Sequence, residues 1–358
     1  MDDPPQFTCL IPDLPDEISV QIIARVPRSH HQTLCHVSRS WRSLLLKRLL
    51  FTLRSSLHCA EPTLCLNIHT PAETDSSQWL VLNRGHFLPS RPLPTGFLSS
   101  ACAAVGPFVF LLGGSLPGVP SNVVQILDLR LGGKWFLGPR LSTAREFAAV
   151  SYLNGRLYVM GGCSPSSEAW AESLNLFDRN PQWVPIDSPR FLRNKWMHGC
   201  LVLSGQIVAM AGQFVFAYDP GQNTGSCPAW VPAPEELDLG WRRWAVVVNN
   251  IVYSYDYTGK IVGYDAGMDK WSTVLGVDKN IPKCKSGVTL ANLNGILCVI
   301  WREQIFGSKR KEMAVDWVGI EVTNLGSEGL HGSILWQETV SLDLPCGSSI
   351  AHCVVAEF

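Results

Sequence analysis

Apolar and polar positions along most of this chain follow one pattern, which returns after about 45 to 50 residues. In each copy an apolar run leads to a tight turn and to a second apolar run that ends near a glycine pair. A strand ending in an acidic residue and then a tryptophan follow. The clearest copy contains Ala101–Gly106, Phe108–Leu112, Gly113-Gly114, Ile126–Asp128 and Trp135. Self-similarity at this period predicts a ring of β-rich repeats.

The register of the repeat can be followed to the end of the chain. The recurring tryptophans are Trp135, Trp183, Trp230, Trp271 and Trp336. The two-residue turns are Gly106-Pro107, Asn154-Gly155, Ser204-Gly205, Asn249-Asn250 and Asn294-Gly295. Such pairs accept the positive φ that a tight hairpin requires, so each predicts a hairpin between two strands. The glycine pair weakens in later copies, which leaves their register less sharply defined.

This pattern resembles the kelch repeat, in which each copy is a four-stranded blade of a β-propeller. A single four-stranded sheet buries little apolar surface, whereas blades packed around an axis bury both faces. The glycine pair would allow a close approach between blades, and the tryptophan would fill the wedge between neighbours. The predicted repeats span residues 99–147, 148–196, 197–243, 244–285 and 286–345.

A sixth blade is predicted from the two ends of the repeat region. Residues 60–98 contain a partial copy that lacks its innermost strand. Residues 348–358 contain one spare apolar strand, which includes Ile350, Val354 and Val355. Pairing the two would remove an exposed sheet edge and close the ring. The sequence therefore predicts an all-β propeller over residues 60–358 with six blades, the last built from both ends.

The residues before the repeats have a different pattern. Three short stretches with helical spacing are separated by turn signals, and the first stops before Pro27, which disfavours continuing a helix. Residues 10–52 therefore predict a small all-α domain of three helices.

This stretch resembles the F-box, whose helices dock on the Skp adaptor of a Skp–cullin–F-box ubiquitin ligase. The matching elements include Leu14-Pro15, Val26-Pro27, Val37-Ser38, Trp41-Arg42 and Phe51. A bundle this small has little core of its own, so an apolar surface left for a partner is expected beside the residues that pack inside. The resemblance implies that the adaptor contact is formed or supported by Leu14, Pro15, Ile18, Ile22, Val26, Leu34, Val37 and Trp41.

Composition adds limits on the class of protein. The 358 residues have a formal net charge of −1, which gives no footprint of nucleic-acid binding. The 12 Cys include no C-x-x-C pair, the first residues carry acids and prolines, and no apolar run is long enough to span a membrane. We therefore expect reduced thiols, a cytoplasmic or nuclear location or both, and no metal or cofactor.

The loops that lead into the predicted inner strands carry arginines, a lysine and tryptophans, which are residue types enriched at binding hot spots. They suggest a basic, aromatic ring suited to an acidic peptide or a phosphate. The alternative is structural, since these arginines could bond neighbouring carbonyls and the tryptophans could pack as wedges. The candidate target-binding residues are Arg145, Arg193, Lys195, Trp196, Trp241, Arg242 and Arg243.

The two parts together resemble the plant F-box/kelch-repeat proteins over almost the whole chain. The resemblance implies a non-catalytic substrate-recognition subunit of a Skp–cullin–F-box ubiquitin ligase, with an unknown target protein on the propeller. One alternative is a propeller interaction protein that binds the adaptor without directing degradation. Another is a copper-type propeller oxidase, for which His198 and His352 are the nearest ligand candidates, although core hydrogen bonding explains them better.

Overall fold

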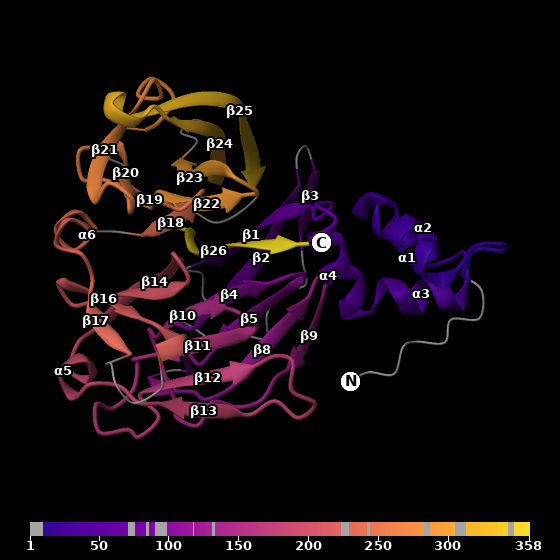
Figure 1. Cartoon of the computed structure of the whole chain (residues 1–358), viewed down its shortest axis with the longest axis horizontal. Helices are drawn as coiled ribbons and strands as arrows, with labels where there is room; N and C mark the ends of the chain where they lie inside the picture. The colour runs from indigo at the N-terminus through magenta and orange to yellow at the C-terminus, as the bar shows by residue number, and fades with distance from the viewer. Residues whose placement is uncertain are drawn as a thin grey trace.

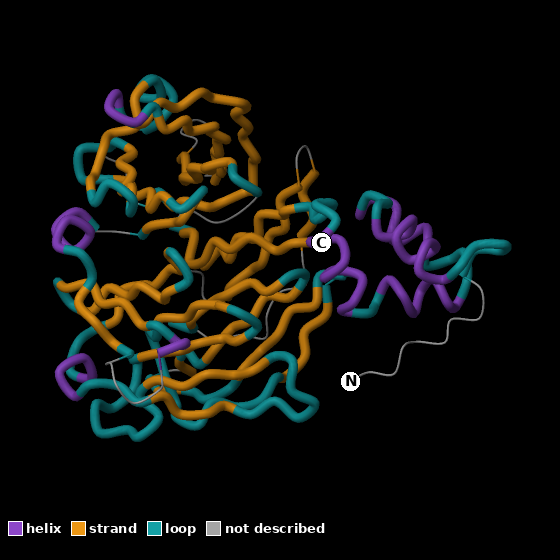
Figure 2. The backbone as a smooth tube through the Cα atoms, in the orientation of Figure 1, coloured by secondary structure: helices purple, strands orange, loops and turns teal. Residues whose placement is uncertain are grey.

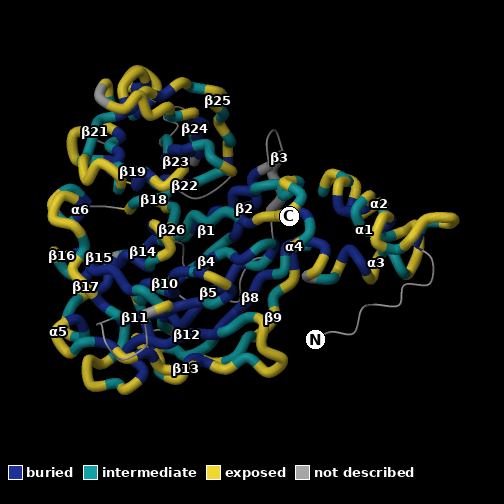
Figure 3. The backbone as a smooth tube through the Cα atoms, viewed as in Figure 1, coloured by how far each residue is buried: buried dark blue, intermediate teal, exposed yellow. Residues whose placement is uncertain are grey.

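The structure, a computed structural model, describes residues 10–70, 76–83, 86–89, 99–116, 118–130, 133–222, 229–241, 244–282, 287–304, 313–342 and 347–358. Helices at the N-terminal end lie on one side of a large β domain (Figure 1). Figure 2 shows that strands make up most of the β domain, with short helices between some of them. Burial is concentrated in these strands, whereas the turns and connecting helices are exposed (Figure 3).

The helical region contains four α-helices among the described residues, where the sequence predicts three. They are α1 (Asp16–Ala24), α2 (His31–Leu34), α3 (Arg39–Leu45) and α4 (Arg48–Ser56), with a 3-10 turn η1 (Arg28–His30) before α2. The third predicted helix is divided because Lys47 is extended, with ψ of 140°. The bend lets Leu44 and Leu45 of α3 and Leu50 of α4 enter one buried cluster. A straight helix would point these side chains in different directions.

The β domain contains four separate four-stranded sheets in the part of the chain that the structure describes. The first, in spatial order, is β26 (Ser349–Glu357), β1 (Pro62–Thr70), β2 (Ser76–Asn83) and β3 (His86–Pro89). The second is β4 (Ala101–Val105), β5 (Phe108–Leu112), β8 (Val124–Asp128) and β9 (Lys134–Leu137). The third is β10 (Ala149–Leu153), β11 (Arg156–Met160), β12 (Ala171–Asn175) and β13 (Trp183–Ile186). The fourth is β14 (Met197–Leu203), β15 (Gln206–Ala211), β16 (Phe214–Tyr218) and β17 (Trp230–Pro232).

The remaining repeats form one eight-stranded sheet, so the described sheets comprise four blades and a larger sheet where the sequence predicts six blades. Its order is β18 (Ala245–Val248), β19 (Ile251–Tyr255), β20 (Ile261–Asp265), β21 (Lys270–Leu275), β25 (Leu330–Leu342), β24 (Met313–Asn324), β23 (Ile296–Gln304) and β22 (Thr289–Leu293). The two halves join because β21 and β25 pair in parallel, through Val274 with Leu330 and Leu275 with His331. The long strands β24 and β25 account for the extra length of the fifth repeat.

Short elements occupy the connections between these strands. The hairpin β6 (Ser115–Leu116) and β7 (Val119–Pro120) follows β5. Helix α5 (Arg190–Arg193) precedes β14, and α6 (Glu235–Gly240) precedes β18. The 3-10 turns η2 (Pro220–Gln222) and η3 (Gly326–Glu328) follow β16 and β24. Helices α5 and α6 lie on the side of the β domain away from the N-terminal helices (Figure 1).

The sheets follow one another around a closed circle. Neighbouring inner strands are in contact in the order β26, β4, β10, β14, β18, β22 and back to β26. Six clusters of buried apolar side chains lie at these junctions, and each contains residues from two successive repeats. Apolar burial between repeats, rather than within one repeat, therefore holds the β domain together.

The first and last strands of the β domain pair, as the sequence predicts. Strand β26 runs antiparallel to β1, with Leu64 opposite Val355 and Leu66 opposite Cys353. Apolar side chains of β26 enter the clusters on both sides of this sheet. The pairing closes the circle without leaving β1 as an open edge.

The predicted turns have the backbone that their residues favour. Asn154, Ser204, Asn249 and Asn294, and also Gly106, all have positive φ at the hairpins that join inner to second strands. The glycine pairs allow the predicted close approach: a Cβ on Gly113 would lie 2.4 Å from the carbonyl oxygen of Arg145. The tryptophans also act as wedges. The Nε1 groups donate hydrogen bonds to carbonyls of the preceding repeat, from Trp183 to Pro139, from Trp230 to Asp187 and from Trp271 to Glu236.

Candidate functional site

Helix α1 presents a row of apolar side chains to solvent. Leu14, just before the helix, and Ile18 and Ile22 within it are four residues apart and therefore lie on one side. All three are exposed. The opposite side of α1 buries Ile23 and Ala24 in the cluster shared with α4 and the β domain. An apolar row facing water on a helix with a buried opposite side is typical of a surface that another protein covers.

The other predicted adaptor residues divide into surface and support. Pro15 and Val37 are exposed, whereas Val26, Leu34 and Trp41 are half-buried. The indole Nε1 of Trp41 donates a hydrogen bond of 2.7 Å to the carbonyl of Leu10. Leu34 and Trp41 pack against the buried cluster of the helical region. The exposed set is therefore Leu14, Pro15, Ile18, Ile22 and Val37, which we call the α1 surface.

A buried arginine joins the helical region to the β domain. Arg54 of α4 is fully buried, and its guanidinium donates to the carbonyls of Ala24, Val26 and Cys59. It also forms an ion pair of 2.7 Å with Glu61, the residue that leads into β1. The same Glu61 oxygen accepts a hydrogen bond of 2.7 Å from the backbone N–H of Arg28. One carboxylate thus binds the ends of two helices at the edge of the β domain.

A second arginine extends this junction. The Arg28 guanidinium lies 3.4 Å from the ring centroid of Phe358 and donates to the carbonyl of Leu129 at 3.2 Å. Burial lowers the pKa of Arg28 to about 10, so it remains charged at neutral pH. Burial also lowers the pKa of His31, whose ring contacts the carbonyl of Val26 at 3.1 Å. These contacts, together with the shared apolar cluster, fix the α1 surface relative to the propeller.

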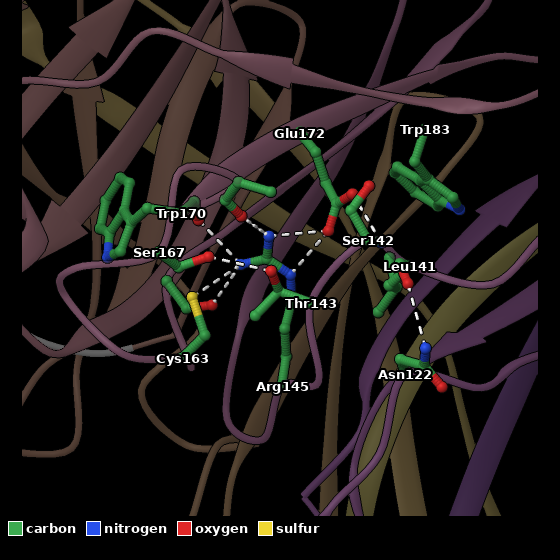
Figure 4. A network of polar contacts seen from close by, with 12 residues as sticks. Asn122, Leu141, Ser142, Thr143, Arg145, Cys163, Ser167, Trp170, Glu172 and Trp183 are labelled. Atoms are coloured by element: carbon green, nitrogen blue, oxygen red, sulfur yellow. Dashed lines mark hydrogen bonds and ion pairs between the residues drawn. The ribbon is translucent and has the colours of Figure 1, made fainter.

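The predicted target-binding residue Arg145 is instead the centre of a buried network (Figure 4). Its side chain and that of Glu172 are both 0% exposed, and they form an ion pair of 2.7 Å. The guanidinium donates to the carbonyls of Gly161 at 2.7 Å and Trp170 at 2.8 Å, and also to that of Ala169. The second carboxylate oxygen of Glu172 accepts a hydrogen bond of 3.0 Å from the backbone N–H of Ser142. Arg145 therefore holds together the loops that precede β10 and β12.

Two of the predicted target-binding residues are thus wrong, and a third has mainly a structural role. Arg145 is saturated by internal partners, and Trp241 is buried among apolar side chains of β14 to β16 and β19. Arg193 donates to the carbonyls of Ser188 at 3.0 Å and Ser167 at 3.3 Å, which ties α5 to the loop before it and to the loop between β11 and β12. The burial of Arg145 accompanies the close packing of its loop on Gly113, where an added Cβ would lie 2.4 Å from the Arg145 carbonyl oxygen. Arg242 and Arg243 lie outside the described residues.

Lys195 and Trp196 do reach the surface of the β domain, beside aromatic residues that were not predicted. Trp196 is 55% exposed, Phe147 before β10 is 47% exposed, and Phe214 at the start of β16 is 50% exposed. Phe147 could have been found from the sequence, because it precedes an inner strand as Trp196 does. Phe214 has no such signal, because it follows the degenerate glycine pair of the third repeat.

Within the described part of the chain, no group of three or more His, Cys, Asp or Glu side chains is placed to hold a metal ion. The same residues include no helix long and apolar enough to cross a membrane. Burial raises the pKa of the Cys65 and Cys200 thiols to about 12, so neither is a thiolate nucleophile at neutral pH.

Comparison with known proteins gives matches to both parts of the chain. The model of the FKB95 Kelch-repeats domain matches residues 63–341, and that of the F-box domain matches residues 11–53. F-box/kelch-repeat protein At4g39550 of Arabidopsis thaliana is 27% identical over 386 residues, covering 98% of this chain and 95% of the relative. F-box/kelch-repeat protein At2g29830 of the same plant is 28% identical over 354 residues, covering 95% and 90%. A solved structure titled "Structure of YjhT" covers 68% of this chain and 99% of its own at 15% identity, with a TM-score of 0.42, too low to carry a conclusion.

Proposed function

Because the chain belongs to the family of FKB95 Kelch-repeats domains and carries an F-box domain before them, we propose that it is a substrate-recognition subunit of a Skp–cullin–F-box ubiquitin ligase. Its α1 surface binds a Skp-type adaptor, and through the adaptor a cullin. Its β domain binds the target protein. The single observation that carries this proposal is the exposed apolar row of Leu14, Ile18 and Ile22 within the F-box match.

In this proposal the chain is not itself an enzyme. It raises the concentration of the target near the charged ubiquitin carrier, so that other subunits perform the transfer. A rigid link between adaptor and target makes this effect larger, because a fixed separation avoids the spread of distances that a flexible linker gives. The Arg54–Glu61 pair and the Arg28 contact to Phe358 supply such a link. We place the complex in the cytoplasm, the nucleus or both, as the sequence suggests.

We also propose that the β domain serves as a six-bladed platform, in which the eight-stranded sheet contributes two adjacent blades. Strands β18 to β21 and β22 to β25 each repeat the order of the four separate sheets. The closed circle of six inner strands and the six interfacial clusters support this assignment. The parallel contact between β21 and β25 is then a local junction at the outer edges of two blades.

Adaptor binding by the purified full chain tests the proposed function. Replacing Leu14 and Pro15 together by Ala removes apolar contact area from the centre of the α1 surface, and we expect adaptor binding to weaken by about 2–4 kcal/mol. The matched control is Leu137→Ala, on the outer strand β9, where the side chain is also exposed. The control should bind the adaptor as the unmodified chain does. Equal adaptor affinity for the double variant and the control would refute the adaptor assignment.

A further inference from the structure

The exposed aromatic side chains of the β domain are unevenly distributed between its two ends. The loops that lead into inner strands, or that follow second strands, carry most of them at the end away from the F-box. These residues are Phe147, Phe191, Trp196, Phe214, Trp244 and Tyr257. Among the described turns at the other end, the corresponding exposed aromatic residue is Phe177. The F-box contacts this other end through Leu129, Arg130 and Phe358.

Phe147 is held in a backbone conformation that a bulky residue rarely adopts. Its φ is 55°, in the left-handed region that favours glycine. Its N–H donates a hydrogen bond of 2.7 Å to the carbonyl of Ser99, and the preceding N–H of Glu146 donates to the carbonyl of Gly162 at 2.9 Å. These bonds fix the loop at the strained residue and at the residue before it. Strain of this kind persists where surrounding structure enforces it, and it gathers at binding sites.

The ring of Phe147 is not isolated. Its centroid lies 5.2 Å from that of Trp196, with an interplanar angle of 43°, although the two residues belong to loops of successive repeats. The carbonyl of Trp196 accepts a hydrogen bond of 2.7 Å from the N–H of Gly212, which is two residues before Phe214. The ring contact thus joins Phe147 to Trp196, and the backbone hydrogen bond joins Trp196 to the turn just before Phe214. We call Phe147, Trp196, Phe214 and Lys195 the aromatic patch.

Lys195 gives the aromatic patch a charge. Its Nζ lies 4.8 Å from the ring centroid of Phe214, a cation–π distance. No ion pair joins Lys195 to an acidic side chain in the described part of the chain. Contact with the ring removes part of the water around the ammonium group, so its attraction for an incoming anion is stronger than that of a freely solvated lysine.

We propose that the aromatic patch binds a short segment of the target protein in which an aromatic side chain stands beside an acidic one. This inference rests on the proposed function and specifies the partner of its target-binding end. The incoming ring stacks on Trp196 and Phe147, whose tilted arrangement is the one that aromatic groups prefer. The neighbouring carboxylate pairs with Lys195, and this opposite charge fixes the orientation of the segment.

The charges near the aromatic patch favour a peptide over a nucleic acid. Stacking platforms for single-stranded nucleic acid are combined with a basic groove that follows the phosphates. Here Asp187 lies on the same loop as Lys195 and Arg190, Glu146 directly precedes Phe147, and Glu168 lies on the loop between β11 and β12. The chain has a formal net charge of −1. One unpaired lysine between aromatic rings can neutralise a single carboxylate, whereas a run of phosphates would be repelled by the acidic residues.

Selection of peptides on the purified full chain tests the proposal. A phage-displayed library of random heptapeptides is selected against this chain, and the most enriched sequence is synthesised with a fluorescent label. We expect enriched peptides to pair Phe, Tyr or Trp with Asp or Glu. Trp196→Ala should weaken binding of the synthetic peptide at least tenfold, and Phe177→Ala, an exposed aromatic residue at the other end, should leave it unchanged.

Charge reversal gives a second readout. Lys195→Glu should weaken the acidic peptide at least tenfold and should favour the same peptide with Lys in place of the acid. Enrichment of no peptide, of peptides without this pairing, or of peptides that bind Trp196→Ala unchanged would overturn the proposal. Tighter binding of a labelled 12-mer oligouridylate than of the peptide, lost in Trp196→Ala, would overturn it in favour of nucleic acid. Adaptor binding by the unmodified chain, measured in parallel, separates the two hypotheses. Absence of adaptor binding would contradict the proposed function and leave the peptide result standing.

Discussion

The buried pair of Arg145 and Glu172 allows a quantitative test of what holds the blades together. Replacing Glu172 by Gln keeps the shape of the side chain and removes its charge. The contacts of 2.7 Å and 3.1 Å, which both end on one carboxylate oxygen, then lose their ionic character. The amide NH2 that replaces the other oxygen faces the N–H of Ser142, which is also a donor. Breaking a buried ion pair by removing one partner costs about 3–5 kcal/mol, because the remaining charge has no compensation. Both side chains are 0% exposed, so solvent cannot replace the lost partner.

Replacing Arg145 by Met tests the hydrogen bonds that its guanidinium donates to backbone carbonyls. The carbonyls of Gly161 and Ala169 lose the guanidinium as their donor, and each unsatisfied buried acceptor costs about 1–3 kcal/mol. The carbonyl of Trp170 keeps the hydrogen bond of 3.0 Å from the N–H of Gly161. The double variant Arg145→Met/Glu172→Met removes both charges but leaves the carbonyls of Gly161 and Ala169 without the guanidinium. We therefore expect it to be less destabilised than the sum of its single variants, yet to remain below the unmodified chain in stability.

Urea unfolding followed by tryptophan fluorescence measures these differences. The matched control is Glu168→Gln, an exposed residue nearby in sequence, for which we expect a change within about 0.5 kcal/mol. Adaptor binding should be unaffected in every variant that remains folded, because α1 packs on a buried cluster that contains neither Arg145 nor Glu172. A loss below about 1 kcal/mol for Glu172→Gln, or a loss equal to that of the control, would show that the pair does not hold the loops.

The remaining predictions concern closure, close packing and pH. A chain that ends at Gly347 lacks β26, which leaves the inner edge of β1 unpaired and opens two apolar clusters, so we expect aggregation in size-exclusion chromatography. A soluble monomer with the parent melting temperature would contradict this. Gly162→Ala places a Cβ 2.4 Å from the carbonyl oxygen of Glu146, whereas Gly118→Ala, also at positive φ, meets no atom within 4 Å. The free energy of unfolding in urea should fall by at least about 2 kcal/mol more for Gly162→Ala than for Gly118→Ala. Equal falls would exclude the close approach as the cause. Burial lowers the pKa of His352 to about 4, below its unfolded value. The unfolded chain therefore binds a proton at this residue between about pH 6.5 and 4, whereas the folded chain does not. The free energy of unfolding should fall over this range as the pH drops, by at most about 1.4 kcal/mol per pH unit. His352→Asn should flatten this fall between pH 6.5 and 4 in unfolding titrations, and an unchanged slope would show that another group titrates.

Local signals in the sequence determined much of the fold. Pairs such as Asn154-Gly155 specify a hairpin by themselves, because few other residues accept positive φ. The missing inner strand of the first repeat and the spare strand at the end also predicted the β26–β1 pairing, since an unpaired edge is unfavourable. The merging of β21 with β25 had no local signal, because it depends on contacts between residues 274–275 and 330–331.

The candidate site was harder to predict, because charge on a loop does not reveal burial. Arg145 has the residue type of a binding hot spot, but Glu172, 27 positions later, returns beside it and neutralises it. The break between α3 and α4 also could not be predicted, because no glycine or proline marks it. Lys47 adopts an extended backbone there because tertiary packing favours the bend. By contrast, Leu14, Ile18 and Ile22 were expected at the surface from the resemblance to the F-box, and helix geometry places residues at this spacing on one side.

Ubiquitin transfer to proteins bound by the β domain is the most direct test of the ligase-subunit proposal. The full chain and the variant Ile18→Asp/Ile22→Asp are each expressed with the proteasome blocked, and captured proteins and their ubiquitylated lysines are quantified by mass spectrometry. We expect both versions to capture the same target proteins, because the substituted residues lie on α1, whereas the aromatic patch lies on the loops before β10 and β14 and at the start of β16. The partners should carry ubiquitin with the unmodified chain and lose it with the variant, which also loses the adaptor. Equal ubiquitylation of the shared partners with both versions would contradict the account.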